Sequence, residues 1–275
     1  MPVDHTGTDE SVHNALRMTR VTRLSIVVAI AVLTILSWWH LARLSREMAA
    51  MNADAEAMAA MGMPMDVPWS SGDVAAAVGM WIVMMIGMMS PATLPVLFVV
   101  ARSESARNGA PLRTTGMFAA GYLAVWTSFS VVAAVLQWTL HDLALLPASM
   151  TLASGIGGVV LIGAGLYQLT PLKRACLVYC RNPMDVLMTH WRAGLAGAWR
   201  MGAHHGWHCV GCCWALMVVL FAVGIMNLAW VGFIAVFVLL EKMNVGGAWL
   251  TRVAGGLLIA GGVVELMRAS GFGLQ

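Results

Sequence analysis

Long blocks of apolar residues alternate with short polar segments along most of the chain. The blocks fall at about residues 24–42, 74–100, 115–139, 150–170, 203–226, 228–246 and 249–268. A helix of about 20 apolar residues spans the hydrocarbon core of a bilayer, whereas a membrane β-barrel strand shows a shorter, alternating pattern. The pattern therefore predicts an all-α, polytopic membrane helix bundle. We expect seven transmembrane helices, or six if the last two blocks are bent segments of one element.

The polar segments divide the chain into five expected parts. They are a cytoplasmic N-terminal tail at 1–22, an anchor transmembrane helix at 23–42, a Met-rich periplasmic loop at 43–73, a membrane helix bundle at 74–268 and a C-terminal tail at 269–275. The first apolar block is too long for the core of a signal peptide, and no convincing cleavage site follows it. We therefore expect an anchor that is not cleaved.

Lys and Arg residues are distributed unequally between the two sides of such a bundle. With the N-terminus inside, 13 of the 16 Lys and Arg residues lie on the cytoplasmic side, and only Arg43, Arg46 and Arg268 lie on the other. Cytoplasmic segments of membrane proteins carry an excess of positive charge. The asymmetry predicts a multi-pass protein of the bacterial inner membrane, with a cytoplasmic N-terminus and a periplasmic C-terminus.

Composition narrows the class further. The chain is 60% hydrophobic and 11% charged, whereas soluble domains have about 25% charged residues. These values exclude an ordinary soluble enzyme and a disordered chain. No run of basic residues interleaved with aromatics is present, so nucleic acid is not an expected partner. The five cysteines cluster late in the chain, unlike the dispersed set of a secreted disulfide scaffold.

The densest group of potential metal ligands opens the fifth apolar block. It contains His204, His205, His208, Cys209, Cys212 and Cys213. Residues four apart on a helix share a face. His204, His208 and Cys212 therefore form one stripe, and His205, Cys209 and Cys213 form the next. Imidazole and thiolate groups suit Cu(I) or zinc, so the spacing predicts a copper site, with zinc as the alternative metal.

Two further cysteines, Cys176 and Cys180, follow the fourth apolar block. If this segment is helical, both thiols lie on one face. In the predicted orientation all five cysteines are cytoplasmic, where thiols stay reduced. The group indicates metal ligands or redox groups, while unrelated loop cysteines are the alternative for this pair.

A carboxylate is predicted at the depth of the cysteine cluster. The turn between the fifth and sixth blocks is centred near Met226 and Asn227, and Cys212 precedes it by about as many residues as Glu241 follows it. Equal counts in an antiparallel hairpin mean equal depth, because the rise per residue is constant. A carboxylate inside a bilayer usually forms an ion pair or has a functional role. We expect Glu241 to orient or charge-balance the metal site, and the alternative is an interfacial pair with Lys242.

The second apolar block carries a methionine face. Met84 and Met88 share one side of a helix, with Met85 and Met89 beside them. Such a stripe alone is more typical of apolar packing than of a metal path. However, 11 of the 22 methionines lie between Met48 and Met89. A thioether-rich outer loop that leads into a thioether-lined helix predicts a route for Cu(I).

Small residues four apart allow membrane helices to approach closely. Ser154 with Gly158, and Gly256 with Ala260, have this spacing. We expect both pairs at helix contacts.

Several of these motifs together resemble those of one bacterial family. They are the string from His205 to Met217, Pro171–Lys173 with the cysteines that follow, the run from Met84 to Pro91, and Glu241–Lys242. The family is a domain-of-unknown-function family described as predicted metal-binding integral membrane proteins. The resemblance covers roughly residues 74–268 and implies metal binding without a particular reaction. Family members often have a proline shortly after the Glu-Lys pair, where this chain has Met243–Gly246.

These features support three hypotheses. The first is a membrane protein that transports, delivers or stores Cu(I). Its partners would be the lipid bilayer, the metal ion, and a metal chaperone or a neighbouring membrane subunit. The second is a membrane-embedded copper-dependent oxygenase or oxidase. The third is a transmembrane thiol–disulfide carrier, with Cys209–Cys212 and Cys176–Cys180 as redox pairs.

Overall fold

The computed structural model describes residues 19–61, 69–107, 109–143, 145, 152, 154–182 and 191–270. Within these residues the chain is almost entirely helical and contains no strand. The elements are α2 (Arg20–Ala60), α3 (Ser71–Met89), the short 3-10 helix η1 (Pro91–Thr93), α4 (Leu94–Ala106), α5 (Pro111–Asp142), α6 (Ser154–Leu169), α7 (Pro171–Arg181), α9 (Gly194–Val223), α10 (Leu228–Lys242) and α11 (Gly247–Ala269). The predicted all-α bundle is confirmed. Residues 1–18 and 271–275 of the expected tails, and residues 62–68 of the expected loop, lie outside the described residues.

The number of full-length spans differs from the expected seven. Among the described residues, five helices are long and apolar enough to cross a membrane: α2, α3, α5, α9 and α11. A sixth span results if α6 and α7, which meet at a bend of 62°, are counted together. At 15 residues, α10 is about 22 Å long, shorter than a hydrocarbon core of about 30 Å. The alternative in which the last two blocks form one bent element is wrong, because α10 and α11 are separate helices and the bent pair lies earlier in the chain.

The first helix is longer than the expected anchor. α2 continues without interruption from Arg20 to Ala60 and contains 41 residues. The anchor was expected to end at residue 42 and to be followed by a loop. Ala, Met and Glu are strong helix formers and fill most of residues 47–60. Their propensity explains why the helix extends beyond the apolar block.

Local sequence signals set the ends of the helices around the core. Ser70 and Asp73 form a capping box at the start of α3. Pro91 follows the end of α3 and opens η1, because proline cannot continue the hydrogen-bond ladder of a helix. Thr170 caps α7, and Pro171 occupies its first turn. These signals separate α3 from α4 and α6 from α7.

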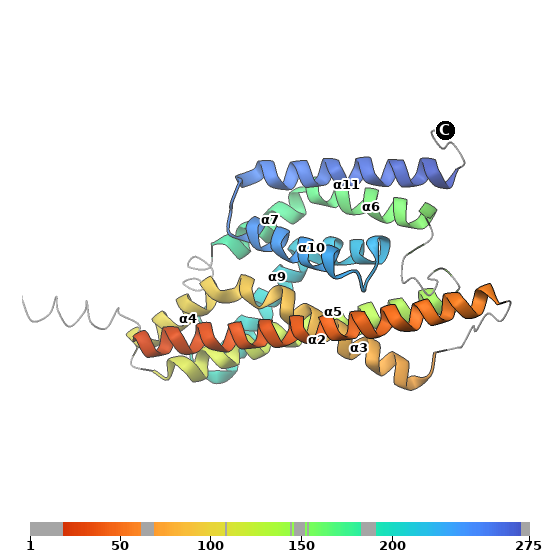
Figure 1. Cartoon of the computed structure of the whole chain (residues 1–275). Coiled ribbons are helices and arrows are strands. Elements are labelled where there is room, and N and C mark those ends of the chain that lie inside the picture. The colour runs from red at the N-terminus through yellow and green to blue at the C-terminus, as the bar shows by residue number, and fades with distance from the viewer. Residues whose placement is uncertain are drawn as a thin grey trace, which may run out of the picture.

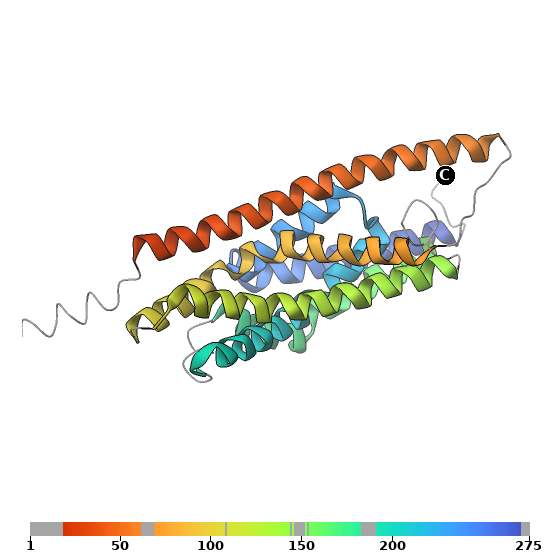
Figure 2. The same ribbon diagram turned by 90° about the horizontal axis from the view of Figure 1, so that it is seen from below.

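The core lies where α3, α5 and α9 pack together (Figure 1). α6 and α11 run side by side along one edge of the bundle, and α2 runs along the other. Figure 2 shows the full length of α2 against the remaining helices. The large side chains that are fully buried include Trp81, Trp126 and Phe221, which contribute to the same core. The candidate ligands are therefore positioned by the helices in the middle of the bundle.

Glycines set the close contact between α6 and α11. A Cβ atom on Gly158 would lie 2.8 Å from the carbonyl oxygen of Gly262, and one on Gly165 would lie 2.7 Å from that of Gly255. The expectation for Gly158 is thus confirmed. The expectation for Gly256 with Ala260 is wrong, because both residues are exposed. The stripe that touches α6 is one position away, at Gly255 and Gly262.

Candidate metal centre

Three cysteines of α9 converge inside the bundle. Cys209, Cys212 and Cys213 are each at most 1% exposed. The Sγ atoms of Cys212 and Cys213 both donate to the carbonyl oxygen of Cys209, at 3.1 and 2.7 Å. One helical turn therefore directs two thiols to the backbone oxygen of the third cysteine.

Helix α7, which follows the bend after α6, adds two more thiols to this group. Cys180 Sγ lies 4.0 Å from Cys212 Sγ. Cys176 lies against Gly211 of α9. A Cβ atom added to Gly211 would lie 3.0 Å from the Cys176 sulfur. All five cysteines are free thiols. The structure thus joins α7 to α9 through Cys180 and Cys212, a pair that the helical spacing did not single out.

Cys209 is linked to two other helices by polar contacts. Its Sγ lies 3.1 Å from the Tyr122 hydroxyl of α5 and 2.8 Å from Lys242 Nζ of α10. Tyr122 also donates to the carbonyl oxygen of Met89, at 3.4 Å. Sequence reasoning missed Tyr122 entirely and treated Lys242 as a partner of Glu241 or as an interfacial residue. The hairpin count that placed Glu241 level with the cysteines also applies to Lys242 and could have indicated this contact.

The histidines lie around aromatic rings in the first half of α9. His205 is buried, with ring centroids 6.0 Å from Phe118 and 5.9 Å from Tyr122. His204 and His208 both contact Tyr179 of α7. His204 Nδ1 forms a 2.6 Å hydrogen bond with the Tyr179 hydroxyl, and His208 stacks on the ring at 3.8 Å. Within the part of the chain that the structure describes, no three His, Cys, Asp or Glu side chains are arranged so that they could already hold a metal ion.

Glu241 is paired, but with a different residue from the one considered. Its Oε2 forms a 2.8 Å salt bridge with Lys173 Nζ, and both side chains are at most 1% exposed. Thr251 donates to Oε1 at 2.8 Å, and Arg181 donates to the Glu241 carbonyl oxygen from Nε and Nη2. Lys173 also donates to Gln168 Oε1. The carboxylate thus ties α10 to α7 and α11 in a charged network beside the cysteine cluster.

The methionine face of α3 points into the same core as the cysteines. Met84, Met85, Met88 and Met89 are each at most 2% exposed. They belong to one continuous buried cluster with the three cysteines and Met217 of α9. Met84 also lines a small cavity of about 10 Å³ together with Met226, between α2, α3 and α10. Thioethers and thiols therefore share one interior.

Comparison with known proteins adds one finding. The model of a family described as "PpoB2: Copper chaperone" matches residues 78–265, which is more than half of the chain. No curated protein and no solved structure matches the chain. The matched segment contains every candidate ligand described above, and its description names copper and gives no support for zinc. The matching family has a different name from the domain-of-unknown-function family that the motifs resemble.

Proposed function

The chain belongs to the PpoB2 family, described as copper chaperones, and from this membership we propose that it receives Cu(I) within the membrane and hands it on. The methionines of α3 accept the ion, and the cysteines of α9 together with Cys180 of α7 hold it next. Copper is the cargo in this proposal. The alternative is a copper-dependent oxygenase or oxidase. In that case the same residues would hold copper as a cofactor, and the substrate would enter from the lipid.

The continuity of the sulfur-rich core carries the proposal. Met89 and Cys209 belong to one buried cluster, and the Tyr122 hydroxyl contacts the Met89 carbonyl oxygen and the Cys209 sulfur. Soft thioether and thiolate ligands select Cu(I) over harder ions. An ion that leaves the methionines of α3 would therefore meet the cysteines of α9 without passing through solvent.

The spacing of the closest thiols suits a single soft ion. Cys180 Sγ and Cys212 Sγ are 4.0 Å apart, which is less than twice a metal–thiolate bond of about 2.3 Å. Both sulfurs could therefore bind one ion with little backbone movement. Lys242 Nζ beside Cys209 offsets part of the negative charge that thiolate ligands bring into the bundle.

Copper binding is tested on the full chain purified in detergent. Cu(I) is titrated anaerobically against a coloured chelator, and bound copper per chain is measured. Cys212→Ser and Cys180→Ser should each weaken binding by more than about 100-fold, beyond the roughly 10–100-fold loss typical of residues that only support ligands. Cys176→Ser is the matched control on the same helix as Cys180 and should retain most of the affinity. If both test variants fold and bind as much copper as wild type, the proposal is wrong.

A thiol–disulfide carrier is the second candidate, because Cys180 and Cys212 are already neighbours. In that reaction two thiols would become one disulfide, and two electrons and two protons would pass to the disulfide of a partner protein. Thiol trapping in cells should then show a partly oxidised Cys180–Cys212 pair. Complete alkylation of all five thiols under every growth condition would exclude this function.

We also propose the orientation in the inner membrane, with the N-terminus in the cytoplasm. The charge asymmetry supports the cytoplasmic N-terminus, and the path of the chain supports opposite sides for its two ends, since α2 begins at one end of the bundle and α11 finishes at the other (Figure 1). A reporter fused after Gln275 should be periplasmic, and one inserted within 102–113 should be cytoplasmic. A C-terminal reporter that is active only in the cytoplasm would contradict this orientation.

A further inference from the structure

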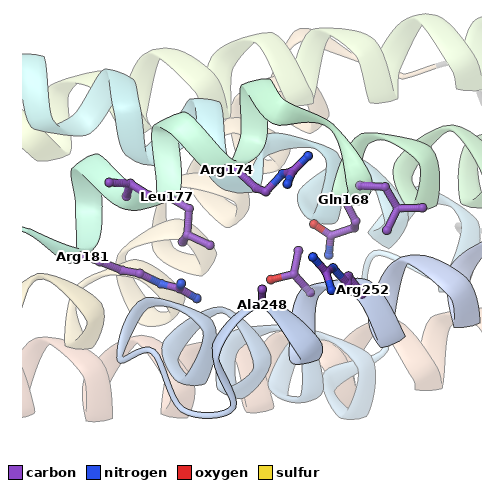
Figure 3. Close-up of a pocket in the computed structure, with 9 residues that line it drawn as sticks. Gln168, Arg174, Leu177, Arg181, Ala248 and Arg252 are labelled. Carbon is purple, nitrogen blue, oxygen red and sulfur yellow. The ribbon is translucent and has the colours of Figure 1, made fainter.

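A second polar region lies between α7 and α11, outside the sulfur-rich core. It is a cavity of about 410 Å³ whose polar lining consists of Gln168, Arg174, Arg181, Thr251 and Arg252. Figure 3 shows the three arginines and the Gln168 amide around this hollow. Its size is that of a pocket for a small molecule or a headgroup.

Gln168 offers this cavity an unused hydrogen-bond donor. The side chain is 1% exposed, and its Oε1 accepts from Lys173 Nζ. Because Lys173 can only donate, this contact fixes the orientation of the amide. Gln168 Nε2 is buried and has no hydrogen-bond partner among the described residues. A buried donor without an acceptor is costly, so an acceptor in the cavity would satisfy it.

The arginines give the cavity an excess of positive charge. In the described part of the chain, neither Arg174 nor Arg252 forms a salt bridge. Arg181 uses Nε and Nη2 on the Glu241 carbonyl oxygen, so its other terminal nitrogen remains available. The Glu241 carboxylate does not neutralise the arginines, because it is bound by Lys173 and Thr251. Guanidinium groups around an amide donor are suited to the oxygens of a phosphate.

The remaining wall of the cavity is apolar. Leu169, Leu177 and Val178 line it, and Leu169 and Val178 are 41% and 55% exposed on the surface of the bundle. The cavity opens between two helices and has both apolar and arginine walls. It therefore fits an anion that carries an apolar chain better than a small inorganic anion. Basic pockets between membrane helices on the cytoplasmic side bind anionic headgroups in other proteins.

We propose that the cavity between α7 and α11 binds the phosphate of an anionic phospholipid from the cytoplasmic leaflet. Arg174 and Arg252 contact the phosphate oxygens, Gln168 Nε2 donates to one of them, and an acyl chain runs along Leu169 and Val178. This site is independent of copper binding, since none of these residues belongs to the cysteine or methionine cluster.

The test uses the full chain in detergent and counts bound lipid by native mass spectrometry. Dioleoylphosphatidylglycerol is titrated against dioleoylphosphatidylcholine. Wild type should retain one phosphatidylglycerol selectively, and Arg174→Gln with Arg252→Gln should weaken its binding by about 25-fold, or about fivefold per arginine. Arg113→Gln with Arg200→Gln is the matched control, because both residues are exposed on the cytoplasmic side and lie outside the cavity. Copper per chain should remain unchanged in both double variants.

Three results would overturn the proposal. The first is equal phosphatidylglycerol binding by wild type and the Arg174/Arg252 double variant. The second is equal retention of phosphatidylcholine. The third is displacement of the lipid by millimolar inorganic phosphate, which would assign the pocket to a free anion. If the double variant does not fold, each single arginine variant still gives a measurable fivefold effect.

Discussion

Glu241 and Lys242 are neighbours at the end of α10, yet their side chains enter two different regions of the bundle. Glu241 lies in a charged region, with Lys173 of α7 and Thr251 of α11. Lys242 lies in the sulfur region, where its Nζ is 2.8 Å from Cys209 Sγ. The two regions differ in how completely their polar atoms are satisfied.

In the charged region the acceptors of Glu241 are taken by donors of the protein itself. Lys173, Thr251 and Arg181 bind its two carboxylate oxygens and its carbonyl oxygen. In the sulfur region the thiols and thioethers form weak hydrogen bonds and remain suited to a soft metal. In our proposal the first region positions the helices and the second region binds the metal. It also removes Glu241 from the set of expected metal ligands in our proposal.

The largest effect is expected from breaking the charged region. Glu241→Leu leaves the Lys173 ammonium buried without its counter-ion, which should cost about 3–5 kcal/mol of unfolding free energy. Lys173→Met combined with Glu241→Leu should recover most of this loss, because an apolar pair can replace a buried ion pair. Denaturation in detergent, followed by circular dichroism, gives both values. If Glu241→Leu alone is as stable as wild type, the Lys173–Glu241 pair has no structural role.

A smaller effect is expected at Lys242, on copper and not on the fold. Lys242→Met removes the cation beside Cys209 and should lower Cu(I) affinity by about 10–100-fold, with little change in the unfolding midpoint. Lys242→Arg, which keeps the charge, should lose less. Glu241→Gln should weaken copper binding less than Lys242→Met does in the same chelator competition. The reverse order would assign the metal-supporting role to Glu241.

The smallest effect is expected on the path into the site. Met84→Leu with Met88→Leu keeps side-chain volume and removes only the sulfur. Copper loading from the periplasmic side of proteoliposomes should slow, while copper per chain at equilibrium stays the same. Met267→Leu is the matched control, because Met267 is 54% exposed on α11. Unchanged loading kinetics in the double variant would mean that the α3 methionines only fill the core.

The sequence predicted those features that depend on composition and on spacing along one helix. The helical bundle, the buried methionine face of α3 and the convergence of Cys209 with Cys212 and Cys213 all follow from the length of apolar blocks and the period of a helix. The common depth of the end of α10 and the cysteines followed from counting residues on both sides of one turn. The contact between Lys242 and Cys209 agrees with that count.

Features that depend on the relative rotation of separate helices could not be derived in this way. Lys173 is 68 residues from Glu241, and Cys180 is 32 residues from Cys212. Both contacts depend on the 62° bend that turns α7 against α9. The contact stripe of α11 was displaced by one position, at Gly255 and Gly262 instead of Gly256, because small residues occur on several of its faces.

The length of α2 determines how far the protein reaches from the bilayer. A helix of 41 residues is about 61 Å long. Even at a tilt of about 40° it needs only about 40 Å to cross a hydrocarbon core of about 30 Å. About 20 Å of the helix therefore extends beyond the hydrocarbon core, and Met51, which is 60% exposed, lies in the last quarter of α2. In the orientation that we propose, this extra length lies in the periplasm, and a protein that delivers copper would meet the rigid end of α2 first.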